Sequence, residues 1–484
     1  MAQLRPISIL LVWLVLAVQP TAFGRQAPVP TEELEKRIPE LMAAARIPGL
    51  SIALIRDGRV AWHRGFGLAN VETRAPVTDN TIFEAASLSK PVFAYAVLKL
   101  ADRGLLDLDA PLSRYLPEPY ISGDDRIDRI TARIVLDHTT GFPNWRPRGQ
   151  PLKIFFVPGE KFSYSGEGYV YLQKAVERIT GRPLNDSMKE TVFDPLGMSA
   201  SSYVWREDYD RLSATGHNLF GGVVEKRKPS QANAAASLHT TALDFARLVI
   251  AVMNGTGLDA RSSGMMLTPQ SKVDERCTNC TDRPDFHPSA SLSWGLGWGL
   301  EKTGSGSYFW HWGDNGVFRC FVMASRETRS GVAVFTDSEN GLAVAGEITR
   351  LALGGEHPSI AWLRYDQYDA PAMKFVLTAL DEGAASAISR YRKMEGSAGY
   401  PIPKEEDVNR LGYAFLRMKK VDDAVRLFDW NVELYPKSYN VYDSLAEALA
   451  TRGDTERAIQ NYKKSLELNP DNTNARERLK DLIR

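Results

Sequence analysis

The sequence predicts an α+β domain, with an antiparallel sheet flanked by helices and a helical subdomain, followed by an all-α repeat domain. Three observations lead to this prediction. Strand-like apolar runs stand near both ends of the first 350 residues, helical runs lie between them, and the chain from residue 405 onward repeats with a helical pattern. At 484 residues the chain is also too long for one ordinary domain.

The composition is that of a globular protein without an excess of either charge. Hydrophobic residues make up 44% of the chain and charged residues 24%, which is enough apolar material for a sizeable core. Lysine plus arginine and aspartate plus glutamate number 59 each. No electrostatic argument therefore favours nucleic acid or an acidic surface as a partner.

The first 24 residues have the pattern of a secretory signal peptide. Arg5 precedes the apolar run from Ile7 to Val18, and small residues at Ala22 and Gly24 suit a cleavage site. The run is shorter than the roughly 20 residues that span a bilayer, which disfavours an uncleaved anchor. We therefore expect an exported protein, periplasmic or extracellular, with no stable membrane span after cleavage.

Strand and helix signals alternate in a definite order along the next 320 or so residues. The segment SIALIRDGRVAWHRGFG places two apolar runs around the turn signal Asp57-Gly58, which is typical of a β-hairpin. Strand-like runs return late in YFWHW, FRCFVMAS and GVAVFTD. Helical stretches lie between them, each ending in glycine as helix C-termini favour: FAYAVLKLADRG, GYVYLQKAVERITG and ALDFARLVIAVMNG.

The stretch EAASLSKPVFAY contains a serine and a lysine that could react together. Ser87 and Lys90 are three positions apart, so on a helix the lysine amine can reach the serine oxygen. Pro91 fits the first turn of a helix and so places Ser87 near its N-terminus, where backbone N–H groups favour developing negative charge. The alternative is an ordinary helix start, because serine-x-x-lysine matches are common.

The C-terminal end repeats with a period of 34 residues, over 405–438 and again over 439–472, and a capping helix from Ala475 to Ile483 is expected to complete a repeat domain at residues 405–484. It resembles the tetratricopeptide repeat, in which each unit is a pair of amphipathic helices. A degenerate unit is expected in residues 351–404, at AISRYRK after a helical run from Met373, with SAGYPIP as an inserted loop. Such repeats bind peptides or proteins; the alternative is a packing appendage. The matched positions are Leu411 with Leu445, Gly412 with Ala446, Ala424 with Ala458, Phe428 with Tyr462 and Pro436 with Pro470.

The three cysteines do not form a metal-site pattern. Cys277 and Cys280 stand in CTNC without the second ligand pair that a structural zinc site needs. A local disulfide or two loop thiols are the expected alternatives, and Cys320, in an apolar run, is expected to be a buried strand residue. We expect no metal and no cofactor.

Several longer segments match one known superfamily in the right order. They are FEAASLSKP, DHTTGFPNW, FSYSGEGY, DPLGM, SLHTTALDFARL and LSWGLGWGL. Over residues 30 to 345 the chain resembles the serine β-lactamase and penicillin-binding protein superfamily, in particular its class C β-lactamase-like branch of esterases, D-amino-acid peptidases and β-lactamases. The resemblance implies a β-lactamase/transpeptidase-like fold for a domain at residues 30–350.

The resemblance also implies a role for individual residues. Ser87 matches the acyl-accepting nucleophile and Lys90 its lysine, while Tyr164 matches the tyrosine that shares proton transfer. His311 to Gly313 take the place of the K-T-G strand that lines the substrate cleft. The oxyanion hole would then be the backbone N–H groups of Ser87 and Asp314. Lys90 with a lowered pKa and a Tyr164 phenolate are both possible bases.

Two departures from the branch bear on the substrate. Gly166 stands where the branch often has asparagine, so a side-chain amide is absent. His311, largely neutral at pH 7, stands where β-lactamases carry lysine. Both departures argue against an efficient β-lactamase, and the histidine form is similar to that of D-aminopeptidases and some esterases in the branch.

Neighbouring polar and aromatic residues have plainer interpretations. His138 is expected to be a structural loop residue, and Glu160 and Glu167 are expected to be solvated. Trp294 and Trp298 either line the substrate cleft or pack against the sheet.

The sequence thus predicts an exported serine hydrolase that cleaves an amide or ester bond of a small molecule or peptide through a Ser87 acyl-enzyme. A D-amino-acid peptidase or esterase is favoured. One alternative is a penicillin-binding DD-carboxypeptidase or β-lactamase. The other is a catalytically silent scaffold that binds a protein partner through its repeats.

Overall fold

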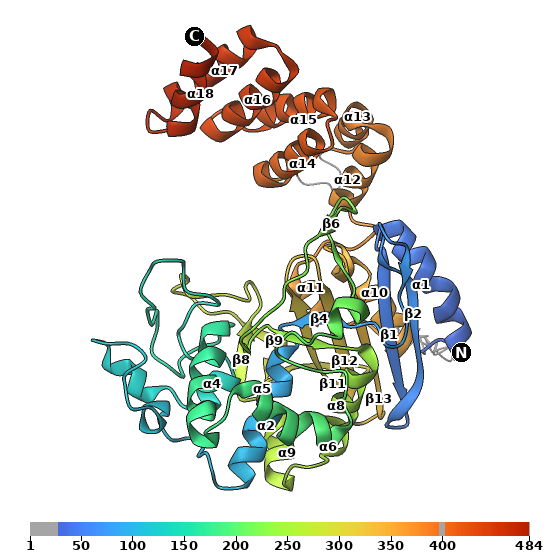
Figure 1. Cartoon of the computed structure of the whole chain (residues 1–484), viewed down its shortest axis with the longest axis vertical. Helices are drawn as coiled ribbons and strands as arrows, with labels where there is room; N and C mark the ends of the chain where they lie inside the picture. Colours follow the sequence, from blue (N-terminus) through green and yellow to red (C-terminus); the bar gives the residue numbers. More distant parts are fainter. Residues whose placement is uncertain (1–27, 396–401, 484) are drawn as a thin grey trace, which may run out of the picture.

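The protein folds into an α/β body and a helical region attached at one end of it (Figure 1). The computed structural model describes residues 28–395 and 402–483. The predicted signal peptide at residues 1–24 lies outside the described residues, as does most of the expected SAGYPIP loop. No helix in the described ranges is both long enough and apolar enough to cross a membrane.

A nine-stranded antiparallel sheet forms the centre of the body, in the order β3-β2-β1-β13-β12-β11-β10-β9-β8. The predicted early hairpin and the late strands are confirmed, and they meet in the middle of the sheet, where Leu50 pairs with Thr336. The strands are β1 (Gly49–Arg56), β2 (Arg59–Asn70), β3 (Ala75–Pro76), β8 (Ser271–Asp274), β9 (Pro288–Trp294), β10 (Gly299–Thr303), β11 (Gly306–Asp314), β12 (Arg319–Ser325) and β13 (Ser330–Thr336).

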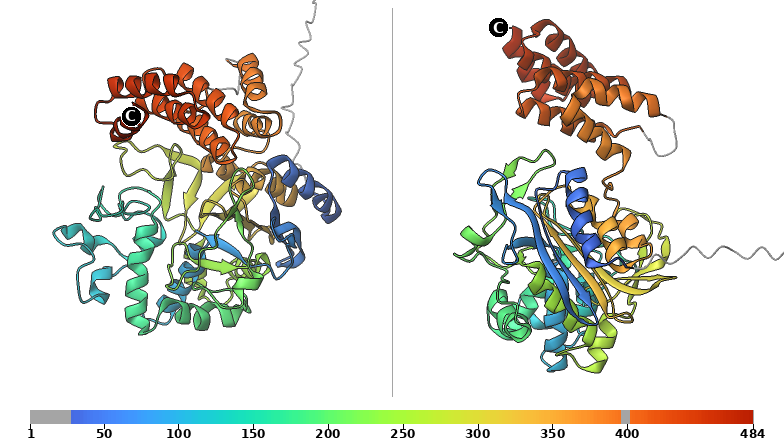
Figure 2. Two further views of the ribbon diagram at one scale, coloured as in Figure 1. Left: turned by 45° about the horizontal axis from the view of Figure 1, so that its top comes forward. Right: turned by 90° about the vertical axis from the view of Figure 1, so that its right-hand side faces the viewer.

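Helices cover both faces of the sheet, as Figure 2 shows from the side. The helices α1 (Thr31–Ala45), α10 (Ala345–Leu353) and α11 (Pro358–Leu363) share one apolar cluster with one face of the central strands. The helices α2 (Ser89–Asp102) and α8 (Ala242–Asn254) share a second cluster with the opposite face. Because both faces are covered, β1 and β13 are buried almost throughout and read as continuous apolar runs.

The remaining elements of the body form the predicted helical subdomain and two small strand pairs. The glycine ends are confirmed, because Gly181 and Gly255 close their helices with a left-handed backbone. The helices are α3 (Ala132–Leu136), α4 (Gly166–Thr180), α5 (Leu184–Met188), α6 (Asp194–Leu196), α7 (Tyr209–Leu212) and α9 (Ala260–Met266). Strand β4 (Phe83–Ala86) pairs with β7 (Leu238–Thr240), and β5 (Gly216–His217) pairs with β6 (Val223–Val224).

The C-terminal region consists of successive helix pairs with a core of their own. The two 34-residue units begin at Glu405 and Tyr439, which are the first residues of α14 and α16, so each unit folds as two helices. The helices are α12 (Pro371–Glu382), α13 (Ala384–Met394), α14 (Glu405–Arg417), α15 (Val421–Leu434), α16 (Tyr439–Arg452), α17 (Thr455–Leu468) and α18 (Thr473–Ile483).

The expected domain boundary at residue 350 is wrong, because it falls inside α10. Leu351 and Leu353 of that helix and Trp362 of α11 are buried in the same cluster as the sheet. Trp362 also donates a hydrogen bond of 2.7 Å to the carbonyl oxygen of Asp274 in β8. The α/β body therefore extends to about α11, and the connection to the helical region begins after it.

The cysteines follow one of the two expected patterns. Cys277 and Cys280 form a local disulfide, so their thiolates are not available as metal ligands. Cys320 lies in β12 and is buried, as predicted.

Candidate active site

Ser87 lies on a strained turn between β4 and α2. Ala86, the last residue of β4, has φ +49°, a left-handed conformation that is unfavourable for a residue with a side chain. The turn is held in place because the Ser89 hydroxyl donates to the Ala86 carbonyl oxygen at 2.5 Å and accepts from the Leu238 N–H at 3.0 Å. This fixed turn presents a half-buried Ser87 just before the helix.

Lys90 reaches Ser87 from the first turn of α2, as the spacing predicts. Its Nζ lies 3.0 Å from Ser87 Oγ and 2.9 Å from the carbonyl oxygen of Ala235, to which it donates. The side chain is fully buried, and this burial lowers the pKa of Lys90 well below its ordinary value. A neutral amine at this position can accept the Ser87 proton.

Tyr164 completes a convergent group with these two residues. The Nζ atom of Lys90 lies 4.7 Å from the centroid of the Tyr164 ring. The phenol oxygen is buried and makes no hydrogen bond of normal geometry within the described part of the chain. Burial raises the pKa of Tyr164 well above its ordinary value, and the nearby Ser87 hydroxyl offsets only part of this rise, so the phenol holds its proton at neutral pH. These directions favour the Lys90 amine over a Tyr164 phenolate as the base.

Tyr164 is oriented by a histidine that the sequence identified only as structural. The rings of His138 and Tyr164 have centroids 4.2 Å apart, and His138 Nδ1 accepts a 3.0 Å hydrogen bond from the Ser165 N–H. His138 is fully buried, with φ +59°. The prediction that His138 is a structural residue of a loop is confirmed, and its position explains how the Tyr164 ring is fixed.

The end of β11 lies directly against the Ser87 turn. A Cβ atom on Gly313 would lie 2.3 Å from the Ala85 carbonyl oxygen, so only glycine lets the strand approach this closely. The sequence-predicted segment of His311, Gly313 and Asp314 is therefore brought to the turn that carries Ser87.

The strand pairing shows which way the backbone of Asp314 points. The N–H of Asn315 bonds the Phe318 carbonyl oxygen at 3.1 Å and closes the hairpin between β11 and β12. Because hydrogen-bonded pairs alternate in antiparallel strands, the N–H of Asp314 points away from β12. The Asp314 N–H therefore points to the side of β11 on which β10 lies. Because the pairing of β10 with β11 ends at Trp310, no strand among the described residues accepts a hydrogen bond from the Asp314 N–H.

The backbone N–H of Ser87 is the second donor of this kind. It makes no backbone hydrogen bond among residues 28–395 and 402–483. Two free N–H groups beside one hydroxyl match the donor pair that stabilises a tetrahedral oxyanion.

His311 is buried beside the site as a neutral ring. Its Nδ1 lies 2.7 Å from the Trp312 carbonyl oxygen, and because a carbonyl only accepts, Nδ1 carries the hydrogen. Burial, with Lys90 as a smaller contribution, lowers the pKa of His311 to about 3. The ring is fully buried and contacts Tyr164 at 6.0 Å between centroids, so His311 supplies no cation to a substrate.

Trp145 occupies the space that a side chain at position 166 would need. A Cβ atom on Gly166 would lie 2.8 Å from Cη2 of the indole. The Trp145 ring is 44% exposed, and its centroid is 6.0 Å from Lys90 Nζ. Sequence reasoning identified the glycine but missed the tryptophan, although it ends the matched segment DHTTGFPNW.

Two expectations for neighbouring residues resolve in opposite ways. Glu160 is exposed as expected, but Glu167 is buried, so its predicted solvation is wrong. Glu167 accepts hydrogen bonds from the Arg146 backbone N–H at 3.1 Å and from the Tyr120 hydroxyl at 3.3 Å, and it pairs with the Arg146 guanidinium. These donors compensate the buried carboxylate.

The tryptophans of the SWGLGWG segment pack rather than line an open site. Trp294 and Trp298 are fully buried. Trp294 contacts His138 and His311 at 5.2 and 5.5 Å between ring centroids, so it supports the site from behind.

Comparison with known proteins connects this geometry with one family. A family model described as Beta-lactamase matches residues 34–355. The chain is 32% identical to Esterase EstB of Burkholderia gladioli over 221 residues, which are 40% of this chain and 56% of that protein. It is 31% identical to Penicillin-binding protein 4* of Bacillus subtilis (strain 168) over 171 residues, 31% of this chain and 36% of that protein. The aligned segments thus span about half, or less, of these relatives.

Solved structures agree on the fold. The octameric penicillin-binding protein homologue from Pyrococcus abyssi is 25% identical and superposes with a TM-score of 0.55, over 72% of this chain and 80% of its own. A Beta-Lactamase/D-Alanine Carboxypeptidase from Pseudomonas syringae superposes with a TM-score of 0.57 over 66% of this chain and 98% of its own. Its identity of 19% makes this second likeness one of fold alone.

The close approach at Gly313 predicts the effect of a single methyl group. Gly313→Ala should lower the rate at which a fluorophosphonate labels Ser87 by about 100-fold, because the strand must move away and takes the Asp314 N–H with it. Gly304→Ala, in the turn before β11, is the matched control, since nothing lies within 4 Å of its Cβ position. Equal labelling rates in the two variants would contradict the placement of β11.

Proposed function

Because the chain belongs to the beta-lactamase family of serine hydrolases, we propose that it cleaves an ester or amide bond through an acyl-enzyme on Ser87. The observation that carries this proposal is the buried Lys90 amine, 3.0 Å from Ser87 Oγ, with burial holding its pKa low. A buried amine in hydrogen-bond reach of a hydroxyl is the arrangement that activates a serine nucleophile.

The proposed reaction uses each group of the site in turn. Lys90 takes the Ser87 proton as Oγ bonds to the substrate carbonyl carbon, and the N–H groups of Ser87 and Asp314 stabilise the resulting oxyanion. Tyr164 passes this proton from the Lys90 ammonium to the leaving group as the bond between the leaving group and the carbonyl carbon breaks. Water then attacks the acyl-enzyme, returns a proton through the same groups, and releases the acid and free Ser87.

The side chains around Ser87 support a D-amino-acid peptidase or an esterase. Gly166 offers no amide to hold a substrate carbonyl, and neutral His311 offers no cation to a carboxylate. The exposed Trp145 indole instead offers an apolar face above Lys90. Of the two activities, the tryptophan favours an esterase for apolar acyl groups, which agrees with the similarity to Esterase EstB.

The same proposal places the protein outside the cytoplasm and gives its helical region a binding role. The signal-peptide pattern of residues 1–24 supports export. The 34-residue period and the helix pairs that it produces support a tetratricopeptide-repeat module. Its partner would be a peptide or protein.

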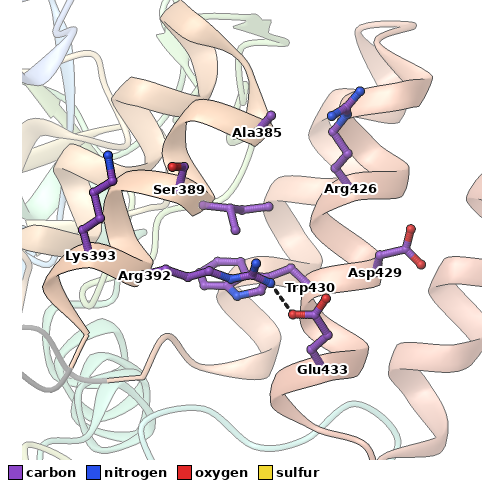
Figure 3. Close-up of a pocket in the computed structure, with 9 residues that line it drawn as sticks. Ala385, Ser389, Arg392, Lys393, Arg426, Asp429, Trp430 and Glu433 are labelled. Carbon is purple, nitrogen blue, oxygen red and sulfur yellow. Dashed lines mark hydrogen bonds and ion pairs between the residues drawn. The ribbon is translucent and has the colours of Figure 1, made fainter.

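A groove between α13 and α15 is a suitable place for such a peptide (Figure 3). It has a volume of about 550 Å³, and its lining includes the buried apolar side chains of Ile388 and Trp430. An ion pair between Arg392 and Glu433 crosses it. The other lining residues are Ala385, Ser389, Lys393, Arg426 and Asp429.

The nucleophile can be identified by covalent labelling. A fluorophosphonate probe should modify the wild-type protein at Ser87, because the activated hydroxyl attacks phosphorus as it would a carbonyl carbon. Peptide mass mapping locates the adduct, and Ser87→Ala should remove it. Ser89→Ala, which removes the neighbouring hydroxyl that holds the turn, should slow labelling but leave the adduct at residue 87. Modification elsewhere, or labelling that survives Ser87→Ala, would rule out the mechanism.

The role of Trp145 can be read from acyl-chain preference. Trp145→Ala should reduce kcat/KM for p-nitrophenyl butyrate by about 10-fold relative to p-nitrophenyl acetate, because the longer chain loses its apolar contact. Trp145→Phe should keep part of the preference. Phe155, another exposed aromatic residue of the subdomain, provides a control variant, Phe155→Ala. An unchanged ratio in Trp145→Ala would exclude the indole from substrate contact.

A further inference from the structure

Tyr365 lies outside the region that the family model matches, and it contacts Asp314, whose backbone N–H is one of the two proposed oxyanion donors. Tyr365 lies after α11, in the segment that leads to the helical region, whereas the family match ends at residue 355. Its hydroxyl donates a 2.6 Å hydrogen bond to Oδ2 of Asp314. The burial of Tyr365 and the Asp314 carboxylate both raise the pKa of the phenol, which therefore stays protonated and remains a donor.

Other groups complete the environment of the Asp314 carboxylate. Arg319 Nε lies 3.3 Å from Oδ2, and the Gly316 N–H donates to Oδ1 at 2.7 Å. The Arg319 guanidinium also stacks over the Tyr365 ring at 4.8 Å. The Asp314 side chain is 24% exposed, so the hydrogen bonds from Tyr365 and the Gly316 N–H, with the charge of Arg319, compensate the hydration that the carboxylate loses.

The charge of Asp314 is unfavourable for the proposed chemistry. The backbone N–H of this residue is assigned to an oxyanion, and a carboxylate on the same residue repels the negative charge that develops there. A hydrogen bond from Tyr365 and the positive charge of Arg319 offset this repulsion. They also hold the Asp314 side chain on the face of β11 opposite to the one that Gly313 presents to the Ser87 turn. The strand can then present its N–H to the reacting carbonyl oxygen.

We propose that Tyr365 is a positioning residue of the active site, which holds the Asp314 carboxylate and weakens its repulsion through a hydrogen bond, so that the Asp314 backbone N–H can stabilise the oxyanion. This inference rests on the proposed acyl-enzyme mechanism and deepens it. The active site then includes a residue of the connecting segment, 51 positions after Asp314 in the chain. Tyr365 and Arg319 also line a cavity of about 490 Å³ that reaches the helical region at Arg410, so these two residues lie between the oxyanion strand and that region.

The test compares full-length variants with p-nitrophenyl acetate as substrate. Tyr365→Phe should lower kcat by about 10-fold with KM changed by less than about 3-fold, because the lost interaction acts in the transition state. Adding Asp314→Asn should restore kcat to within about 3-fold of wild type, because the amide carries no charge to repel the oxyanion. Tyr368→Phe, three residues further on in the same segment, removes a hydroxyl that accepts from Arg37; it is the matched control and should behave as wild type.

The rescue distinguishes positioning from a merely structural role. If Tyr365 only stabilised the fold, Asp314→Asn would not restore kcat, and that result would overturn the proposal. A wild-type kcat in Tyr365→Phe would overturn it as well. If circular dichroism shows that Tyr365→Phe does not fold, Arg319→Gln replaces it, because this variant removes the positive partner of the carboxylate. Arg319→Gln must then lower kcat, and adding Asp314→Asn must restore it. Failure of the mechanism itself would be recognised separately, as wild-type protein that is not labelled at Ser87.

Discussion

The structure depends on one amine that is buried without a carboxylate partner. An ammonium group at the position of Lys90 would lose its hydration, and burial is the first cause of its lowered pKa. The surrounding fold makes this burial possible, since every residue of α2 from Ser89 to Leu98 is buried. In the proposed mechanism, this neutral amine is the base that takes the Ser87 proton.

The rest of the fold brings distant segments to that amine. The turn at Ala86 aims Ser87, the His138 ring fixes Tyr164, and Gly313 allows β11 to lie against the turn. Each device is rigid, because it relies on buried packing or on a backbone conformation with few alternatives. Trp145 differs from these groups, since its indole is exposed and it lies in the space that a side chain at position 166 would need.

Local signals in the sequence predicted much of this arrangement. The Asp57-Gly58 hairpin, the glycine-ended helices and the helix pairs all follow from periodicity and turn chemistry, and the proximity of Ser87 and Lys90 follows from helical spacing. Contacts between distant residues had no such signal. Tyr365 has no motif around it, the burial of Glu167 depends on partners 21 and 47 residues away, and the boundary inside α10 depends on a shared core. Tertiary packing decides these features.

The most direct test is a titration of Lys90 itself. With ¹³C-labelled lysine, the ε-carbon resonance of residue 90, assigned by its loss in Lys90→Met, should titrate with a midpoint well below 10.5, because burial disfavours the ammonium. The rate of Ser87 labelling should rise with pH through the same midpoint, since the neutral amine is the form present above it. A lysine that titrates near 10.5 while Ser87 reacts fully at neutral pH would contradict the account.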